Sequence, residues 1–517
     1  MTSCGSRCES NERALLTAGS ALFLFTWTAL YLTDVNHPPG VRTARIAGAA
    51  LAIGIGILEY SRRWWGFYAF LILWPQMMVA RELLQMLFGP AWGALPTITA
   101  GPLAASLTIG FALHQMKFPK KAAAPEINST SESAFINHSW IRIALWCLAF
   151  IWTLSAAIAT ARLWNIPPAG WHVDPADWRH ASGPSAYSAL APAASALRIV
   201  PEFLLGLMLF NVCGRNSNPP TNNLLKCIAA STVLVTLEIL LQLVLNRNWA
   251  FDENPPGGPF NNRNTAAPIL VIFGVLVLAA QMHRPNGKVI RRTLATVCIG
   301  LGCSLLSRNG LFSAGVLAVV YLTLSLQRRW IVFAAMGAAA AIFLWAPLPK
   351  SETISSVGVR RVILTIEELR AGDWNAVTSY RSELYVSALK IFGKYPLCGS
   401  GPATFPMLAS PGSIYAVSGW GAYFSAHSMP LNLAAEIGII GALAWILLWL
   451  VFPAVVLWRE RRISWLWISV LMIGVANLLD TVWFAAGMGT LSMMILWLAC
   501  RENEDPQPLT NSILNTE

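Results

Sequence analysis

Residues 430–453 read PLNLAAEIGIIGALAWILLWLVFP, an apolar stretch interrupted by a single charged residue, Glu436. A helix needs about 20 apolar residues to cross the hydrocarbon core of a bilayer, so this stretch is long enough to span a membrane. Similar stretches recur along the chain, in which 55% of the residues are hydrophobic and 12% are charged. The composition therefore predicts an all-α, polytopic transmembrane protein rather than a large soluble domain.

The apolar stretches indicate about 12–14 membrane spans joined by polar segments. They lie at residues 14–32, 46–60, 64–80, 95–113, 141–160, 194–212, 225–245, 265–283, 293–306, 311–326, 330–346, 430–453, 464–479 and 482–500. The chain then divides into N-terminal transmembrane helices (1–113), a cytoplasmic linker (114–140), transmembrane helices with periplasmic loops (141–346), a large periplasmic loop (347–429), C-terminal transmembrane helices (430–500) and a cytoplasmic tail (501–517). We expect the linker to separate four peripheral helices from the functional ten.

Lysine and arginine residues are distributed unevenly between alternate loops. One side of the predicted bundle holds 19 of them, including Arg62, Arg63 and the four basic residues between 284 and 292. The short loops of the other side hold roughly half as many, and cytoplasmic loops are the ones enriched in these residues. We therefore place both ends of the chain inside and the loop 347–429 outside. The net charge of +11 is mainly an orientation signal, and no continuous basic domain indicates nucleic-acid binding.

Two helices are predicted inside the outer loop 347–429. Apolar residues recur at helical spacing against charged neighbours over 358–370, which predicts an amphipathic helix. A second helix is expected to follow Thr378 or Ser379, as its N-cap, and to run to Tyr395.

Four polar segments, far apart in the sequence, fall on the outer side of this topology. They are Gly258–Ala266 (GPFNNRNTA), Ser307–Gly310 (SRNG), Tyr380–Gly401, with YRSE at its start and PLCGSG at its end, and His427–Gly441, which ends in EIGIIG. Ionised groups cost little outside the hydrocarbon, so this is where we expect the chemistry of the protein.

These segments, in this order, resemble those of the O-antigen ligase and O-antigen polymerase family of bacterial inner-membrane glycosyltransferases, over about residues 195–500. The most specific part is the pairing of an Arg-containing helix and a Pro-Leu-x-Gly-x-Gly turn with a His and a Glu-x-Gly-x-x-Gly helix start. The Gly-Pro-Phe-x-Asn-Arg-Asn segment is also similar to that of members from exopolysaccharide clusters. The chain departs from the family at Ser428, because His-Asn is common there and this chain has His427-Ser428.

The resemblance implies a glycosyltransferase of the C type that works on the periplasmic face of the bacterial inner membrane. The implied donor is an undecaprenyl-diphosphate-linked glycan, with no nucleotide sugar, no cofactor and no obligatory metal. The sequence of the outer loops is consistent with the absence of an obligatory metal, since it shows no Asp-x-Asp pair and no His/Cys cluster with ligand spacing. The implied acceptor is lipid A core for a ligase or the growing glycan for a polymerase, and a protein hydroxyl is a further possibility. The expected partners are thus lipid-linked glycans and membrane lipids, without nucleic acid.

Arg308 and Arg381 are the leading candidates for contact with the leaving diphosphate. Without a divalent cation, the charge released on cleavage must be met by guanidinium groups, which bind phosphate through two parallel hydrogen bonds. The turn around the two glycines of PLCGSG offers backbone N–H groups to a phosphate. The predicted substrate-binding residues are Arg263, Asn264, Gly399 and Gly401.

His427 is the candidate general base. It precedes a helix whose predicted N-cap is Ser428, and the positive end of that helix favours a neutral imidazole able to accept a proton from the acceptor hydroxyl. Glu436 lies nine residues later, about half a turn round the helix, so we expect it to point away from His427 and to pack against a neighbouring helix.

Two other classes of function stay open on the sequence. A transporter or flippase for lipid-linked glycans would hold basic residues in a central cavity, whereas the predicted spans hold almost no Lys or Arg at mid-depth. A non-catalytic membrane scaffold would be insensitive to the loss of His427. Within the enzyme class, the Gly-Pro-Phe-x-Asn-Arg-Asn segment favours polymerisation of O-antigen or exopolysaccharide over ligation.

Overall fold

The computed structural model describes residues 13–26, 39–74, 95–117, 138–164, 191–212, 221–244, 263–280, 287–305, 307–325, 357–378, 381–409, 425–460, 463–484 and 487–502. Within these ranges every regular element is a helix. Five helical stretches are long and apolar enough to cross a membrane: Ser139–Trp164, Ala191–Phe210, Thr221–Val244, Arg308–Ser325 and Met429–Glu460. The prediction of an all-α chain with several membrane-spanning helices is confirmed.

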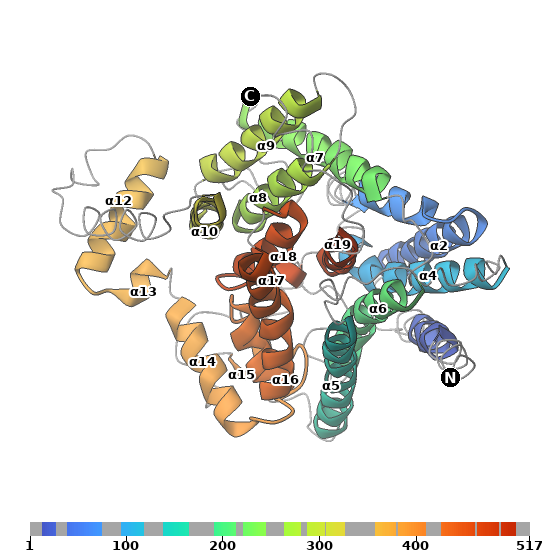
Figure 1. Ribbon diagram of the computed structural model, residues 1–517. Coiled ribbons are helices and arrows are strands. Elements are labelled where there is room, and N and C mark those ends of the chain that lie inside the picture. The colour runs from blue at the N-terminus through green and yellow to red at the C-terminus, as the bar shows by residue number, and fades with distance from the viewer. Residues whose placement is uncertain are drawn as a thin grey trace.

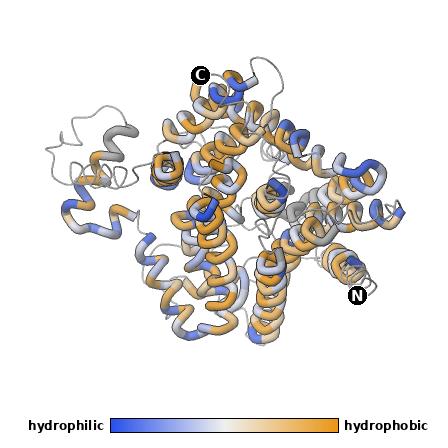
Figure 2. Tube along the Cα trace, viewed as in Figure 1, coloured by the Kyte–Doolittle hydropathy of each residue, from blue (hydrophilic) through white to orange (hydrophobic). Residues whose placement is uncertain are grey.

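Most helices coincide with predicted spans (Figure 1). In chain order they are α2 (Pro39–Ser61), α4 (Leu95–Lys117), α5 (His138–Trp164), α6 (Ala191–Val212), α7 (Thr221–Val244), α8 (Arg263–Ala279), α9 (Gly287–Ser304), α10 (Arg308–Ser325), α12 (Val357–Arg370), α13 (Trp374–Val377), α14 (Arg381–Lys394), α15 (Phe405–Leu408), α16 (Met429–Ile446), η6 (Leu447–Val451), α17 (Phe452–Glu460), α18 (Trp465–Ala476), η7 (Val482–Phe484) and α19 (Met488–Glu502). Further apolar helices cover 13–26 and 65–74. The predicted span 330–346 lies outside the described residues. Hydrophobic residues dominate the helices of the bundle, while hydrophilic residues lie mainly at helix ends and along the described part of α12–α14 (Figure 2).

The N-terminal helices share one core with the rest of the chain. α4 packs against both α2 and α6, and Trp64 stacks on Trp497 of α19 with ring centroids 5.2 Å apart. These contacts join the N-terminal helices to the same core, and their separation from a functional ten by the linker 114–140 stays a prediction. A polar linker shows where the chain leaves the membrane, but it does not determine which helices pack together.

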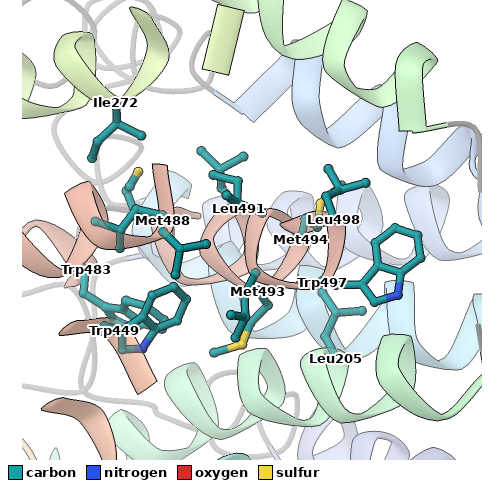
Figure 3. Packing of buried hydrophobic residues seen from close by; sticks show 14 of the residues in the cluster. Leu205, Ile272, Trp449, Trp483, Met488, Leu491, Met493, Met494, Trp497 and Leu498 are labelled. Atoms are coloured by element: carbon teal, nitrogen blue, oxygen red, sulfur yellow. The ribbon is translucent and has the colours of Figure 1, made fainter. Parts of the chain in front are cut away.

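α19 lies in the middle of the bundle. Every residue from Met488 to Arg501 is buried, as expected for a helix that is apolar on all sides. Figure 3 shows side chains of other elements around it, among them Leu205 of α6 and Ile272 of α8. The predicted span 482–500 is not one helix, because the short η7 precedes α19.

α12, α13 and α14 form an arm at one side of the molecule (Figure 1). The predicted helix 358–370 is confirmed by α12, and the predicted second helix by α14, which packs against α16. Thr378, one of the two predicted N-caps, accepts a hydrogen bond from the N–H of Ser382 at 3.0 Å through its hydroxyl. The short α13 is an addition, and the carboxylate of Asp373 caps it by accepting from the N–H of Ala376 at 3.0 Å.

Candidate functional site

The residues that follow α18 hold other parts of the chain together. The N–H of Met429, the first residue of α16, donates to the carbonyl of Asn477 at 2.8 Å. The side chain of Asn309, in the first turn of α10, donates to the carbonyl of Ala476 at 2.9 Å. The Asn477 side chain accepts from the N–H of Trp483 at 2.8 Å and closes the turn between α18 and η7. The starts of α10 and α16 therefore meet at the C-terminal end of α18.

Asp480 lies in this turn and is the partner of two predicted site residues. Its Oδ1 lies 3.0 Å from Nδ1 of His427, and its Oδ2 lies 3.4 Å from Nη2 of Arg381. The other terminal nitrogen of Arg381 donates to the carbonyl of Leu479. Burial by itself would raise the pKa of Asp480, but the hydrogen bond and charge of His427, and then the charge of Arg381, lower this pKa below its ordinary value. The carboxylate is therefore ionised at neutral pH.

The contact with Asp480 determines which ring nitrogen of His427 carries the proton. An ionised carboxylate can only accept hydrogen bonds, so Nδ1 carries the proton in this contact. In the neutral ring, Nε2 is then left as a proton acceptor. α16 does begin after Ser428 as N-cap, as predicted, although the Ser428 side chain makes no capping hydrogen bond. The sequence predicts that the N-terminus of α16 acts on the imidazole. The structure shows that Asp480 contacts the imidazole as well.

Arg308 begins α10 and faces the arm. Its Nη1 donates to the carbonyls of Ala376, at 3.0 Å, and of Val377, and its Nη2 lies 3.5 Å from a carboxylate oxygen of Glu368. The guanidinium groups of Arg308 and Arg381 are close enough to affect each other electrostatically. The structure thus brings Arg308, Arg381 and His427 to the same end of the bundle.

Arg263 and Asn264 form the start of α8 at this end. Oδ1 of Asn264 accepts a hydrogen bond from the hydroxyl of Ser307 at 3.0 Å, and Ser307 directly precedes Arg308. α8 and α10 also pack against each other. Asn264 therefore supports the turn that carries Arg308, with Arg263 next to it in the chain.

The turn that holds Gly399 and Gly401 packs against α16. The N–H of Gly399 donates to the carbonyl of Tyr395 at 3.0 Å, and the N–H of Gly401 donates to the carbonyl of Glu436 at 2.8 Å. A Cβ on Gly399, whose φ is +70°, would lie 2.2 Å from the backbone carbon of Glu436. Both amides have partners within the protein, so these glycines allow close packing here, and the phosphate cradle stays a prediction.

Two residues of this site are absent from the predicted set. Asp480 falls in the gap between the predicted spans 464–479 and 482–500, and an ionisable residue at the end of an apolar segment is the signal that points to it. Tyr385, one turn after Arg381 in α14, interacts electrostatically with Arg381 and Asp480. Burial raises the pKa of the Tyr385 phenol, so the phenol remains a hydrogen-bond donor at neutral pH.

The charged groups described at this end form contacts between opposite charges. Two guanidinium groups and the imidazole of His427 face the carboxylates of Asp480 and Glu368. In the part of the chain that the structure describes, no group of three or more His, Cys, Asp or Glu side chains is placed to hold a metal ion. Metal independence stays a prediction.

Residues 293–446 match the family model for O-antigen ligase. These residues are similar to that family, and we refer to them as the O-antigen ligase domain. This confirms the predicted family, over a narrower region than the predicted 195–500. The O-antigen ligase domain begins within α9 and ends with α16, so it contains Arg308, Arg381 and His427. Asp480 lies outside the matched residues and joins the domain through the contacts described above. No curated protein matches the chain.

Proposed function

We propose that this protein is a membrane glycosyltransferase that transfers or polymerises a glycan carried on undecaprenyl diphosphate, at the periplasmic face of the bacterial inner membrane. The observation that carries the proposal is the contact of His427 with Asp480, which also pairs with Arg381. It places a proton acceptor beside cationic groups, and glycosyl transfer from a lipid diphosphate needs both. The O-antigen ligase domain around His427 supports this reaction class.

In the proposed reaction, Nε2 of His427 takes the proton of an acceptor hydroxyl while the hydroxyl oxygen attacks the anomeric carbon of the donor sugar. A new carbon–oxygen bond forms as the bond from that carbon to the diphosphate oxygen breaks, and the diphosphate leaves with the electron pair. The negative charge of Asp480 stabilises the imidazolium produced. Transfer of the proton from His427 to water restores the base.

The arginines meet the charge of the leaving group. Arg308 and Arg381 carry delocalised charge and N–H groups that match phosphate oxygens, with Arg263 as a third contact. The present partners of Arg308 include two carbonyls and Glu368, at a side chain that is 41% exposed. Phosphate oxygens replace these partners when the donor binds, and Arg381 keeps its contact with Asp480.

The distribution of basic residues supports the periplasmic placement of the site. Arg62 and Arg63 lie in the turn after α2, and Lys117, at the end of α4, lies 5.2 Å from the ring centroid of Tyr60. These ends of α2 and α4 are therefore adjacent and basic. By the enrichment of Lys and Arg on the cytoplasmic side, we assign them to the cytoplasm and the site to the opposite face.

The transporter alternative relies on basic residues inside the spans. α6 contains one such basic residue, Arg198, and Glu202 follows it one turn later. Arg198 donates to the carbonyl of Phe484 in η7, directly after the turn that carries Asp480. Its described contact supports the backbone of the site, so we retain the enzyme as the proposal.

The proposal is tested with purified protein in liposomes, a lipid-diphosphate glycan as donor and EDTA present. We expect wild-type protein to transfer glycan, and His427→Gln to transfer it about 10²–10⁴ times more slowly while still retaining the donor. His114→Gln is the matched control, because His114 lies at the end of α4, where its Nδ1 is 2.8 Å from the carbonyl of Tyr60.

Three acceptors, namely lipid A core, repeat-unit glycan and a hydroxyl-containing peptide, separate ligase, polymerase and protein glycosylation. Movement of the donor across the bilayer without transfer to any acceptor would indicate a flippase instead. Near wild-type transfer by His427→Gln would remove the base role.

A further inference from the structure

A buried pair of polar side chains lies in α16 directly behind His427. Asn432 is 1% exposed and Glu436 is 3% exposed. Oδ1 of Asn432 accepts from the N–H of Ala426 at 3.0 Å, and Nδ2 of Asn432 donates to Oε2 of Glu436 at 3.0 Å. Oε1 of Glu436 accepts from the N–H of Phe405, the first residue of α15, at 3.1 Å. These contacts form a continuous chain of hydrogen bonds from the peptide before His427 to α15. We call Asn432 and Glu436 the Asn432–Glu436 bridge.

His427 needs such support because of its backbone conformation. Its φ is +49°, in the left-handed region that residues with a side chain rarely adopt. A conformation of this kind persists only where surrounding contacts impose it. One contact is the hydroxyl of Ser425, which accepts from the N–H of His427 at 3.3 Å and lies 2.9 Å from the hydroxyl of Thr481. The other is Asn432, which holds the preceding amide from the side of the helix.

The bridge also ties His427 to the turn before α15. Glu436 receives the N–H of Phe405 through its side chain and the N–H of Gly401 through its carbonyl. Glu436 thus packs against a neighbouring element, as predicted, although that element is a short helix of the outer loop. Displacement of either bridge residue shifts the peptide that sets the direction of the imidazole.

We propose that the Asn432–Glu436 bridge is a positioning device for the reaction, holding the Ser425–Ala426 peptide, one residue before His427, so that Nδ1 meets Asp480 and Nε2 faces the acceptor hydroxyl. The inference rests on the proposed base role of His427 and adds to it two buried residues that act through the histidine. A misplacement of about 1 Å in a reacting group can reduce a rate by roughly 10²-fold, so a contact this close to the base affects turnover.

The donor and acceptor roles of residues 432 and 436 can be exchanged by substitutions that leave the size of each side chain almost unchanged. Asn432→Asp sets two carboxylate oxygens against each other. Glu436→Gln leaves one acceptor oxygen for two donors, so its NH₂ group faces either the NH₂ of Asn432 or the N–H of Phe405. Each single variant therefore breaks one contact of the bridge. In the double variant Asn432→Asp/Glu436→Gln, the new carboxylate accepts from the N–H of Ala426 and from the new amide. The oxygen of that amide accepts from the N–H of Phe405, so all three contacts are restored and only the one between residues 432 and 436 has its direction reversed.

The experiment measures glycan transfer by the full-length protein in liposomes, with the lipid-diphosphate glycan as donor. We expect each single variant to lower kcat about 10–100-fold with a KM for the donor within about threefold of wild type, and the double variant to recover most of the loss. Asn223→Asp is the matched control, the same substitution at an exposed position at the start of α7, and should transfer at the wild-type rate. Thermal unfolding in detergent is followed for all variants.

Repeating the Asn432→Asp substitution in His427→Gln protein distinguishes loss of positioning from a defect in folding. In His427→Gln protein the base is already lost, so adding Asn432→Asp should cause little further loss of its residual rate. A defect of folding alone would lower the rate equally in both backgrounds and would overturn the inference. So would normal kcat in both single variants, or a double variant no better than the singles. If wild-type protein transfers and His427→Gln does not, the proposed function stands whatever the bridge variants do. If wild-type protein transfers nothing, both fail.

Discussion

The carboxylate of Asp480 is shared between an imidazole and a guanidinium, and the two contacts have different consequences. The contact with His427 orients the ring, with Nδ1 toward the carboxylate. The contact with Arg381 offsets part of the carboxylate charge near the place where a diphosphate would bind. One buried anion therefore prepares the base without leaving the site electrically negative.

Asp480→Asn tests this arrangement through the rate. The amide oxygen of the variant still accepts from Nδ1 of His427, but the negative charge that stabilises the imidazolium is lost. We expect kcat to fall about 10²-fold or more, with donor retention largely kept. Transfer assays with donor binding measured in parallel check this, and wild-type kcat would show that the charge of Asp480 is not used in turnover.

The same variant has a predicted signature in stability. The pKa of Asp480 is lowered in the folded protein from its ordinary value of 3.8. At acidic pH the unfolded chain therefore binds more protons at this residue than the folded chain, so stability rises with pH through this range and then levels off. Thermal unfolding in detergent should show wild-type protein losing stability as the pH falls below about 4. Asp480→Asn should lack this component.

Some residues of the site could be predicted from the sequence and others could not. His427 can be found because it precedes an apolar helix with a recognisable start. Asp480 cannot be paired with it, because helical periodicity relates residues within one element and 53 positions separate these two. The sequence predicts that Arg308 and Arg381 lie on the same side of the membrane, but their partners, backbone carbonyls and Asp480, depend on tertiary packing.

At the scale of elements, α16 is interrupted where the turn before α15 reaches it. Gly438 has φ +78° and ψ −175° inside the helix, and the N–H of Ile439 donates to the carbonyl of Pro396 at 2.9 Å. The N–H of Ile439 therefore binds a loop. In an uninterrupted helix, this N–H would donate to a carbonyl of the same helix. The kink is what allows the outer loop to lie against a membrane-spanning helix.

Gly438→Ala should damage this junction. A Cβ at Gly438 would lie 2.1 Å from the carbonyl oxygen of Leu397, and the left-handed backbone adds a cost for any side chain. We expect a loss of roughly 2–5 kcal/mol in the free energy of unfolding, measured in detergent. Gly393→Ala is the control, since Gly393 lies in α14 and a Cβ at this position would have no neighbouring atom within 4 Å, and it should be neutral or slightly stabilising. Equal stability of the two variants would contradict this account.

The elements themselves could largely be predicted, for a physical reason. Apolar length determines a membrane-spanning helix almost alone, and an amphipathic pattern such as that of α12 determines a surface helix. The kink at Gly438 and the break between η7 and α19 could not be predicted, because both depend on contacts with distant segments. The short α13 depends on a single cap at Asp373.

At the scale of the whole molecule, the orientation in the membrane is open to a direct test. Single cysteines are placed in protein whose native cysteines have been replaced, and intact cells are treated with a thiol reagent that does not cross the inner membrane. We expect labelling of Trp374→Cys in the arm and of Pro175→Cys, and none of Lys288→Cys or Arg459→Cys until the cells are lysed. Labelling of Trp374→Cys only after lysis would place the site on the cytoplasmic face and overturn the proposed periplasmic reaction.

The central position of α19 has a consequence for how the protein is made. A ribosome delivers this helix last among the described elements, yet the others surround it. Until it arrives, the helices already inserted lack the apolar side chains that fill their centre. We therefore expect a chain interrupted before residue 487 to hold the helices that carry His427 and its arginines in a loosely packed bundle, without the activity proposed for the whole chain.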